Sequence, residues 1–290
     1  MSRELTTAPP GRGWVVRRPS RGTVAKEAVL IGAVLVVLLP SLFVVFTALK
    51  SQSDYALDKI GPPPSLYLGN VETAMRGGRF GMWFLNSVIL TGGSVFVSLL
   101  VSAPAAFAFS RMRFRGQTTL LSVVTALMVV PPVVLILPLF LFLTQIGLTS
   151  TYPGVILVYA GLLTPFSVYL LTNFFRAIPH ALIEAASIDG AASHTVLLRI
   201  ILPLTAPALA TLVVVNSLWV WNDLLVALIL LPKDELRTLM VGVTVFGSRY
   251  NNDVPVAMTG MLMASLPMLL LYLIGQRFFI RGLAAGGLKG

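Results

Sequence analysis

Residues 28–49 read AVLIGAVLVVLLPSLFVVFTAL, a run of 22 residues without a charged side chain. A helix needs about 20 mostly apolar residues to cross the roughly 30 Å hydrocarbon core of a bilayer. The segment is therefore predicted to span a membrane, and Pro40 is tolerated there if neighbouring groups satisfy the carbonyl that it frees. The same segment is also suited to act as an uncleaved targeting signal.

The composition of the whole chain supports a membrane protein. Of its 290 residues, 56% are hydrophobic and 11% are charged, and the mean hydropathy is +0.88. About a quarter of the residues are charged in an average soluble domain. Five more apolar segments are predicted as spans, at about 83–109, 118–144, 152–175, 203–231 and 256–279. We therefore expect an all-α integral membrane protein with six transmembrane helices.

The remaining segments are expected to lie outside the bilayer. Residues 1–27 are rich in Arg, Pro, Gly, Ser and Thr, which predicts a flexible basic tail. The Gly61-Pro62-Pro63-Pro64 sequence prevents a continuous helix through residues 50–82. We thus expect one transmembrane domain over residues 28–280 and a short C-terminal tail over 281–290.

The distribution of positive charge predicts the orientation of the chain. With six spans, 14 of the 21 Lys and Arg lie on the side of the two termini and 7 lie on the other side. Lys and Arg accumulate in cytoplasmic loops, so both termini are predicted to be cytoplasmic. Because the net charge of +10 sits beside apolar spans, a lipid surface is favoured over nucleic acid as its partner.

Several kinds of chemistry lack their residues in this sequence. The chain has no Cys and only two His, which excludes a disulfide framework and a thiolate metal site. There is no G-x-x-x-x-G-K-[ST] phosphate loop, no H-E-x-x-H motif and no Ser/His/Asp arrangement. We therefore expect that the chain is not an enzyme and binds no cofactor or metal by itself.

The segment 176–202 is the longest predicted cytoplasmic loop. Pro179 is suited to the first turn of a helix, residues 181–188 are mostly good helix formers, and Gly190 can take the left-handed conformation that ends a helix. A short helix is therefore predicted there. A second helix is predicted from Ser193, as its N-cap, toward Pro203.

One face of the first predicted helix is small and apolar. Leu182, Ala185, Ala186 and Asp189 follow the spacing of a single helical face. A groove on a partner protein can enclose such a face with little loss of side-chain entropy. An ordinary amphipathic loop at the membrane interface is the alternative that this pattern leaves open.

The same loop resembles a known family signature. Glu184-Ala185-Ala186, then Gly190, then Ile200-Ile201-Leu202-Pro203 are similar in type and spacing to the EAA motif of ABC importer permeases. The resemblance implies that the loop forms coupling helices in a groove of an ATP-hydrolysing subunit. The residues expected to make this coupling are Glu184, Ala185, Ala186, Asp189, Gly190, Ala191, Ile200, Leu202 and Pro203.

The resemblance extends over most of the chain and favours the carbohydrate-uptake branch, similar to the maltose-type second permease subunit. Residues 83–87, 106–111, 221–223 and 281–290 also resemble that branch, whereas the basic N-terminal tail is longer than usual. By this resemblance Gly286, Gly287 and Lys289 are expected near the ATPase dimer interface. A frayed terminus is the alternative.

The resemblance implies a type I ABC importer permease fold in a bacterial cytoplasmic (inner) membrane. A sugar or oligosaccharide would be moved by alternating access, with a sister permease as heterodimer, two ATP-hydrolysing subunits and an extracytoplasmic solute-binding protein. Those ATPase subunits would bind ATP and Mg. No nucleic-acid partner is expected. Because few polar groups lie in the spans, the sister subunit is expected to make most sugar contacts.

Three polar residues are candidates for the substrate path: Asn86, Asn222 and Asp223. An ionisable residue within a span is by default a functional candidate, but Asp223 is expected near the outer surface, where a structural role is the alternative. Trp83 and Trp221 are expected in the interfacial aromatic belt, with stacking on a sugar as the alternative. At the level of the whole chain, an ion-driven secondary transporter and a membrane scaffold are the other functions that the residues leave open.

Overall fold

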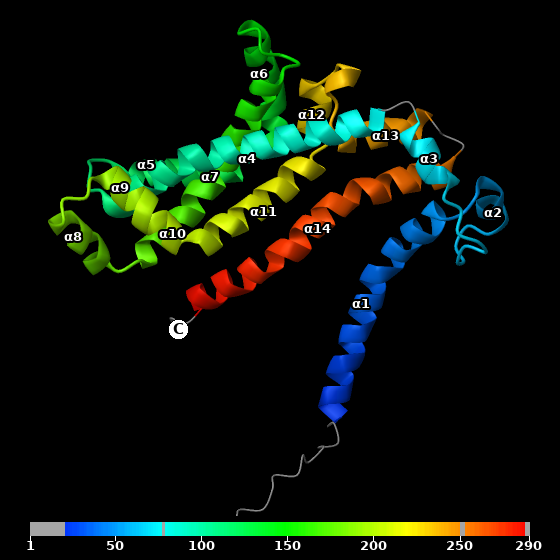
Figure 1. The fold of residues 1–290 in the computed structure, drawn as a ribbon, viewed down its shortest axis with the longest axis horizontal. Helices are drawn as coiled ribbons and strands as arrows, with labels where there is room; N and C mark the ends of the chain where they lie inside the picture. Colours follow the sequence, from blue (N-terminus) through cyan, green and yellow to red (C-terminus); the bar gives the residue numbers. More distant parts are fainter. Residues whose placement is uncertain (1–20, 77–78, 250–252, 288–290) are drawn as a thin grey trace, which may run out of the picture. The chain divides into compact units, whose positions relative to one another are not determined.

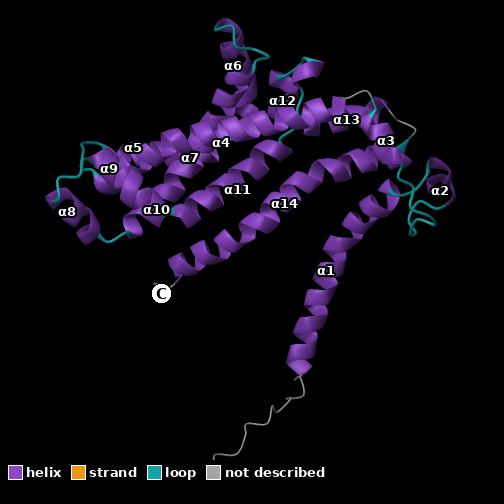
Figure 2. Ribbon diagram, in the orientation of Figure 1, coloured by secondary structure: helices purple, strands orange, loops and turns teal. Residues whose placement is uncertain are grey.

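The computed structural model describes residues 21–76, 79–249 and 253–287. All regular elements in these ranges are helical, as Figures 1 and 2 show. The chain divides into a unit of residues 1–44 and a larger unit of residues 45–290. The all-helical fold predicted from the sequence is thus found in the described part of the chain.

The longest helices are α1 (Arg21–Ala48), α4 (Arg79–Arg111), α7 (Tyr152–Ala177), α11 (Ala206–Asn222) and α14 (Val254–Gly287). Shorter α-helices are α2 (Gln52–Leu57), α3 (Gly69–Met75), α5 (Gln117–Ala126), α6 (Pro132–Gln145), α8 (His180–Ile188), α9 (Ser193–Val196), α10 (Leu202–Leu204), α12 (Leu225–Leu230) and α13 (Leu239–Arg249). Two 3₁₀ turns, η1 (Leu127–Val129) and η3 (Asp234–Leu236), and a π-helical turn, η2 (Leu197–Ile201), complete the described elements.

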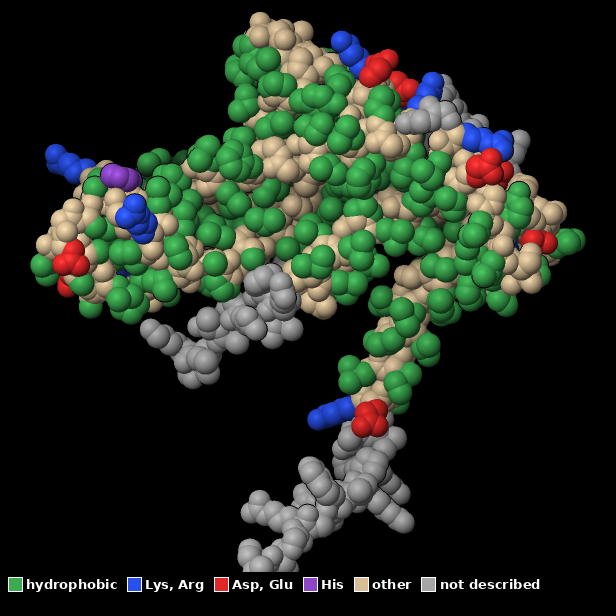
Figure 3. All heavy atoms as spheres, in the orientation of Figure 1, with side chains coloured by type: hydrophobic (Ala, Val, Ile, Leu, Met, Phe, Trp, Pro, Cys, Tyr) green, Lys and Arg blue, Asp and Glu red, His purple; other side chains and the backbone are tan. Residues whose placement is uncertain are grey.

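Four described helices are long and apolar enough to cross a membrane, and two bent helix pairs raise the number to six if each pair is one span. The four lie at Lys26–Ala48, Arg79–Arg111, Tyr152–Ala177 and Val254–Gln276. On the face shown in Figure 3, the side chains over the middle of the larger unit are mostly hydrophobic, and charged side chains gather at its two ends. This distribution is the one expected of a bundle surrounded by lipid.

The centre of the larger unit is the pair α4 and α7, which make more extensive contact than any other two helices. Four buried serines lie along α4: Ser87, Ser94, Ser98 and Ser102. A Cβ atom at Gly93 would come within 2.7 Å of Ile156 in α7. Small residues allow membrane helices to approach closely, and this is how the pair gains its packing.

The predicted span 118–144 is not one straight helix. α5 with η1 and α6 meet at an angle of 101°. The bend lies at Val130 and Pro131, both of which have extended backbone angles. A proline disfavours helical angles in the residue before it and donates no backbone hydrogen bond, so the consecutive Pro131 and Pro132 redirect the chain.

The predicted span 203–231 is also interrupted. The helical segment Ser193–Leu204 meets α11 at 77°, with Thr205 outside the helical region at the bend. At its other end α11 stops at Asn222, Asp223 is extended, and the short helix α12 follows. Asp223 therefore lies at a helix break and not inside a continuous span.

The C-terminal boundary differs from the prediction as well. Helix α14 continues through Gly287, beyond the predicted end of the span at residue 279 and into the predicted tail. Residues 281–287 have good helix formers such as Leu283 and Ala284 among the glycines, which permits this extension. Residues 1–20, most of the predicted N-terminal tail, lie outside the described residues.

Candidate functional site

The helix predicted in the loop 176–202 is present as α8. It ends in the left-handed conformation at Gly190, with φ at +78°. The backbone N–H of Gly190 donates to Ser187, and that of Ala191 donates to Ala186 at 2.9 Å. These two bonds form a Schellman motif, which needs glycine at this position because a Cβ atom disfavours the left-handed region. The spacing of Ala186, Gly190 and Ala191 is therefore a helix-closing arrangement.

The outward face of α8 differs in part from the predicted one. Ala186 packs with Ile183 and Ala191 against the hydrophobic core at the ends of α4 and α7. Glu184, Ala185 and Asp189 are exposed. Two large apolar side chains are exposed beside them, Leu182 at 47% and Ile188 at 86%. Ala186 thus holds α8 to the bundle, while Leu182, Ala185, Ile188 and Asp189 remain available to a partner.

The second half of the loop leads into α11. Ser193 is the first residue of α9 and not its N-cap, because Ala192 takes that position. The π-helical turn η2 follows, and Ile200 and Leu202 pack against the same core as Ala186. Pro203 lies in the first turn of α10 and is exposed. The loop is therefore a folded unit attached to the bundle at both ends.

Two arginines connect the loop to α4 and α7. Arg111, the last residue of α4, donates from Nη2 to the carbonyl of Phe175 and, at 2.6 Å, to that of Ile178. In the opposite direction Arg176 of α7 donates to the carbonyl of Phe109 in α4 at 3.4 Å. Charged donors make stronger hydrogen bonds than neutral ones. The entrance to α8 is thus fixed to the adjoining ends of both central helices.

Asn86 has a structural position in this fold. Its side chain is 2% exposed, and Nδ2 donates to the carbonyls of Glu235 and Arg237 at 2.8 and 2.9 Å. Its Oδ1 accepts from the hydroxyl of Tyr152 at 2.6 Å. Both amide hydrogens are used within the chain, and only one of the two lone pairs of Oδ1 is left without a donor. Asn86 therefore holds the segment 231–238 on α4 and has little capacity left for a solute.

Trp83 and Trp221 are both 4% exposed, so neither lies in an aromatic belt at the surface of this chain or offers a free ring face. Trp221 donates from Nε1 to the carbonyl of Ala264 in α14 at 3.1 Å. A Cβ atom at Gly242 would come within 2.2 Å of the Trp83 ring, so glycine there makes room for it. Both rings pack helices together, which corrects both predictions for them.

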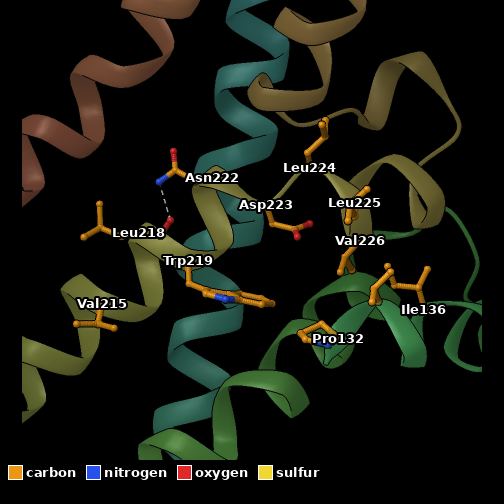
Figure 4. Close-up of a pocket in the computed structure, with 11 residues that line it drawn as sticks. Pro132, Ile136, Val215, Leu218, Trp219, Asn222, Asp223, Leu224, Leu225 and Val226 are labelled. Atoms are coloured by element: carbon orange, nitrogen blue, oxygen red, sulfur yellow. Dashed lines mark hydrogen bonds between the residues drawn. The ribbon is translucent and has the colours of Figure 1, made fainter. Parts of the chain in front are cut away.

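A cavity of about 720 Å³ lies where α11 breaks and α6 begins. Its wall is mostly apolar and includes Pro132, Ile136 and Val226. Figure 4 shows that Trp219 and Asp223 point toward this space, whereas Asn222 is turned toward the carbonyl of Leu218, to which it donates at 2.8 Å. Of the three predicted path residues, Asn222 and Asp223 line the cavity and Asn86 does not.

Asp223 is held by two donors. Its Oδ2 accepts from the hydroxyl of Tyr159 at 2.8 Å and from the backbone N–H of Ala227 at 3.1 Å. The second bond caps the first turn of α12. Tyr159 is fully buried in α7 and also makes an edge contact with Trp219, with ring centroids 6.1 Å apart. One buried tyrosine thus positions both Asp223 and Trp219.

Residues 98–279 match the family described as the binding-protein-dependent transport system inner membrane component. The chain belongs to this family. A permease of this family is a membrane component of an ABC importer, which agrees with the function predicted from the EAA motif.

Individual relatives resemble this permease over most of its length. A putative ABC transporter permease of Caldicellulosiruptor sp. (strain Rt8B.4) is 38% identical over 87% of this chain and 91% of its own. The trehalose transport system permease of Mycobacterium tuberculosis (strain CDC 1551 / Oshkosh) is 32% identical over 87% and 93%. A bacterial ABC transporter involved in the import of the acidic polysaccharide alginate shares the fold, with a TM-score of 0.78 and 23% identity over 93% of this chain and 100% of the other.

Two residues are prominent in the permease structure although the sequence alone predicts no role for them, Arg111 and Trp219. Arg111 was part of a resembling motif, but the carbonyls that it binds lie more than 60 positions later in the chain. Trp219 precedes Asp223 by four residues, so helical spacing was the sign that the two share a face. Of the predicted C-terminal residues, Gly286 and Gly287 lie in the last turn of α14, and Lys289 lies outside the described residues.

Proposed function

We propose that this chain is a permease subunit that imports a sugar or oligosaccharide, and that residues 176–202 couple it to ATP hydrolysis in a partner. The observation that carries the coupling role is the exposed face of α8, with Leu182, Ala185 and Ile188 on a helix closed by Gly190. An exposed apolar helical face on a rigid support is suited to docking in a groove. The EAA spacing supports an ATPase as the owner of that groove.

The coupling step follows from how α8 is attached. Closure of two ATPase subunits around ATP would displace α8, and Arg111 would pass this displacement to α4 and α7 through the carbonyls of Phe175 and Ile178. The folded segment from α9 to α10 would pass it to α11. Because packed helices move as bodies in such transitions, the path between the permease subunits would open alternately to each side.

The partners of the chain follow from the family and the proposed role. A sister permease as heterodimer, two ATPase subunits that bind ATP and Mg, and an extracytoplasmic solute-binding protein would complete the importer, and lipid would surround it. The chain itself would carry no catalytic residue. The trehalose system permease among its relatives supports a saccharide as the solute.

The proposed orientation places both termini and the loop 176–202 in the cytoplasm. In the larger unit, α8 and α9 lie at one end and α3 and α13 lie at the other (Figure 1). Segments 50–76 and 231–238, which follow odd-numbered predicted spans, share this second end. Their placement opposite α8 supports the predicted alternation of sides, and the distribution of Lys and Arg favours the cytoplasm for the end with α8.

Purification of the tagged chain from its native membrane tests this proposal. An ATPase and a second permease should co-purify with it, and ATP hydrolysis should be lost with Gly190→Trp, because a bulky residue is strained at φ of +78° and obstructs the docking face. Gly147→Trp is the matched control, since Gly147 has φ of +73° and open surroundings like Gly190 but lies between α6 and α7.

Equal co-purification of the ATPase with both variants would show that the loop 176–202 is not the docking element. Recovery of the chain without any ATPase, together with uptake that survives ATP depletion and stops when the ion gradient is removed, would contradict the importer function as a whole.

A further inference from the structure

The cavity at the break of α11 has the size and lining of a small-molecule site. Its volume of about 720 Å³ falls within the roughly 300–1,000 Å³ typical of such sites. Sites of this kind combine an apolar wall with a few polar groups that converge on one space. Here the wall is apolar, and the ring of Trp219 and the carboxylate of Asp223 point into the space between them and Pro132 (Figure 4).

Trp219 offers a flat aromatic surface in a fixed position. The ring belongs to a side chain that is 38% exposed, and its orientation is set by the edge contact with the fully buried Tyr159 at an interplanar angle of 85°. An aromatic ring binds apolar C–H surface through its face. The ring face of a pyranose has such C–H groups, so the exposed part of Trp219 is suited to stack on a sugar.

Asp223 supplies the hydrogen-bonding group beside this surface. Its Oδ2 already accepts from Tyr159 and Ala227, and no described residue donates to Oδ1. A carboxylate oxygen accepts from hydroxyl groups in short, charge-assisted bonds. Because two donors hold the carboxylate in place before any ligand arrives, binding would lose little side-chain freedom.

The charge of the lining selects against anions. Asp223 is its one ionisable residue, and no Lys or Arg is among the residues that line the cavity. A uronate or a sugar phosphate would bring a second negative charge near this carboxylate, which is unfavourable for both groups. A neutral sugar has hydroxyl donors without that repulsion.

We propose that this cavity binds one ring of an uncharged saccharide, with the ring stacked on Trp219 and a hydroxyl group donating to Oδ1 of Asp223. The proposal rests on the proposed function and narrows it. This chain contributes its own sugar contacts, in addition to those expected of the sister subunit, and the contacts exclude acidic sugars as ligands of this site.

The test uses the complete importer in proteoliposomes with its solute-binding protein. Uptake of maltotriose, trehalose and raffinose is compared with uptake of a mannuronate trimer. We expect transport of at least one neutral sugar and none of the uronate. For that neutral sugar, Trp219→Ala should raise KM about 10-fold, the effect of removing an aromatic residue that a bound ligand covers. Trp219→Phe keeps an aromatic face and should recover most of the loss.

Two further variants make the result specific. Asp223→Asn keeps the shape of the side chain and removes its charge, so KM for the neutral sugar should rise about 5-fold through loss of a charge-assisted bond. Phe96→Ala is the matched control, because Phe96 is an exposed aromatic residue of α4 that does not line the cavity. Its KM should equal that of the unchanged protein.

The proposal is overturned if Trp219→Ala and Phe96→Ala have the same KM, or if the mannuronate trimer is transported in preference to every neutral sugar. If the Trp219→Ala importer loses its sister subunit on purification, the cavity is part of the contact between the two subunits, and this result also overturns the proposal. In all these cases the ATPase still co-purifies with the unchanged chain, so the proposed function stands or fails on its own experiment.

Discussion

Tyr159 is a single residue on which two parts of the candidate site depend. Replacing it with Phe removes the donor to Asp223 and leaves a partly buried carboxylate with one bond fewer. We expect the free energy of unfolding to fall by about 1–3 kcal/mol, the range for a buried polar group that loses its partner. The midpoint of thermal unfolding in detergent, compared with that of the unchanged chain, measures the effect.

Tyr169→Phe provides the control for this prediction. Tyr169 lies on the same helix, α7, but its side chain is 46% exposed. The loss of its hydroxyl group should leave the unfolding midpoint unchanged. If both phenylalanine variants unfold at the same temperature, the bond between Tyr159 and Asp223 does not contribute to stability.

At the residue scale, the local sequence pattern predicted that Gly190 ends a helix, but it could not predict the internal hydrogen bonds of Asn86. The end of α8 depends on residues within one turn of Gly190, so composition and spacing contain the information. The side chain of Asn86 donates to carbonyls 149 and 151 positions away, and nothing in the local sequence shows which carbonyl groups will accept from it. An intramembrane asparagine alone therefore does not distinguish a solute contact from an internal one.

The segment 231–238 is an element whose position depends on α4. Asn86→Ala removes two hydrogen bonds to this segment. The ion pair of Arg79 with Asp234 remains, and so does the bond from the N–H of Leu239, just after the segment, to Ser87. We expect faster backbone hydrogen exchange in residues 232–238, because local opening costs less free energy. Mass spectrometry of peptic fragments measures it.

Gln276→Ala is a suitable comparison for the Asn86 variant. The amide of Gln276 is exposed and bonds only within its own helix, to the carbonyl of Leu273. Exchange in residues 232–238 should not change in this variant. Equal exchange in both variants would mean that other contacts are sufficient to hold the segment.

The connection between α8 and the central helices makes a second prediction at the element scale. Arg111→Ala removes both bonds to the carbonyls of Phe175 and Ile178. If this connection transmits motion, sugar uptake should fall by about 10-fold or more, and ATP hydrolysis by the purified importer should fall less. This difference corresponds to the loss of about 1–2 kcal/mol of coupling free energy. The ratio of transported sugar to hydrolysed ATP is the measurement.

Arg113→Ala controls for the loss of one positive charge near the same helix end, because Arg113 is exposed in the connection that follows α4. Its transport ratio should stay normal. A proportional fall of uptake and hydrolysis in Arg111→Ala would indicate a general structural defect and would contradict the transmission role.

Hydropathy predicted the helical segments at this scale better than their directions. Residues 118–144 have enough apolar length for one span, yet Pro131 and Pro132 turn the chain by 101° within it. Length and apolarity measure whether a segment suits lipid, while its direction depends on backbone angles at a few positions. The double proline was the local indication of a bend, and beyond it α6 packs against both α12 and α7.

For the whole molecule, orientation can be tested because the chain has no cysteine. Ser187→Cys labels the exposed side of α8, and Ser65→Cys labels the segment between α2 and α3. With both termini in the cytoplasm, a maleimide that cannot cross the membrane should react with Cys at position 65 in intact cells. It should react at position 187 only after the membrane is opened.

Reaction of the two positions in the reverse order would show that the orientation is inverted, which would place α8 out of reach of any cytoplasmic ATPase.

The family and the all-helical fold were predictable from composition and from the EAA spacing, since both depend on properties summed or repeated along the chain. The cavity was not, because it is formed by α6, α11 and α12, whose bends bring residues 132–136 and 215–226 together.

Helix α11 also has a meaning for how such importers diversify. Its first turn follows the loop proposed to meet the ATPase, and its last turn carries Trp219 and Asn222 beside the cavity, so the two ends of one 17-residue helix are under different kinds of selection. A lineage can replace the ring at position 219 and acquire a new nutrient without altering the surface that its ATPase recognises. One ATPase would then serve several permeases, and a cell would gain uptake of a further solute by duplicating only the membrane subunits.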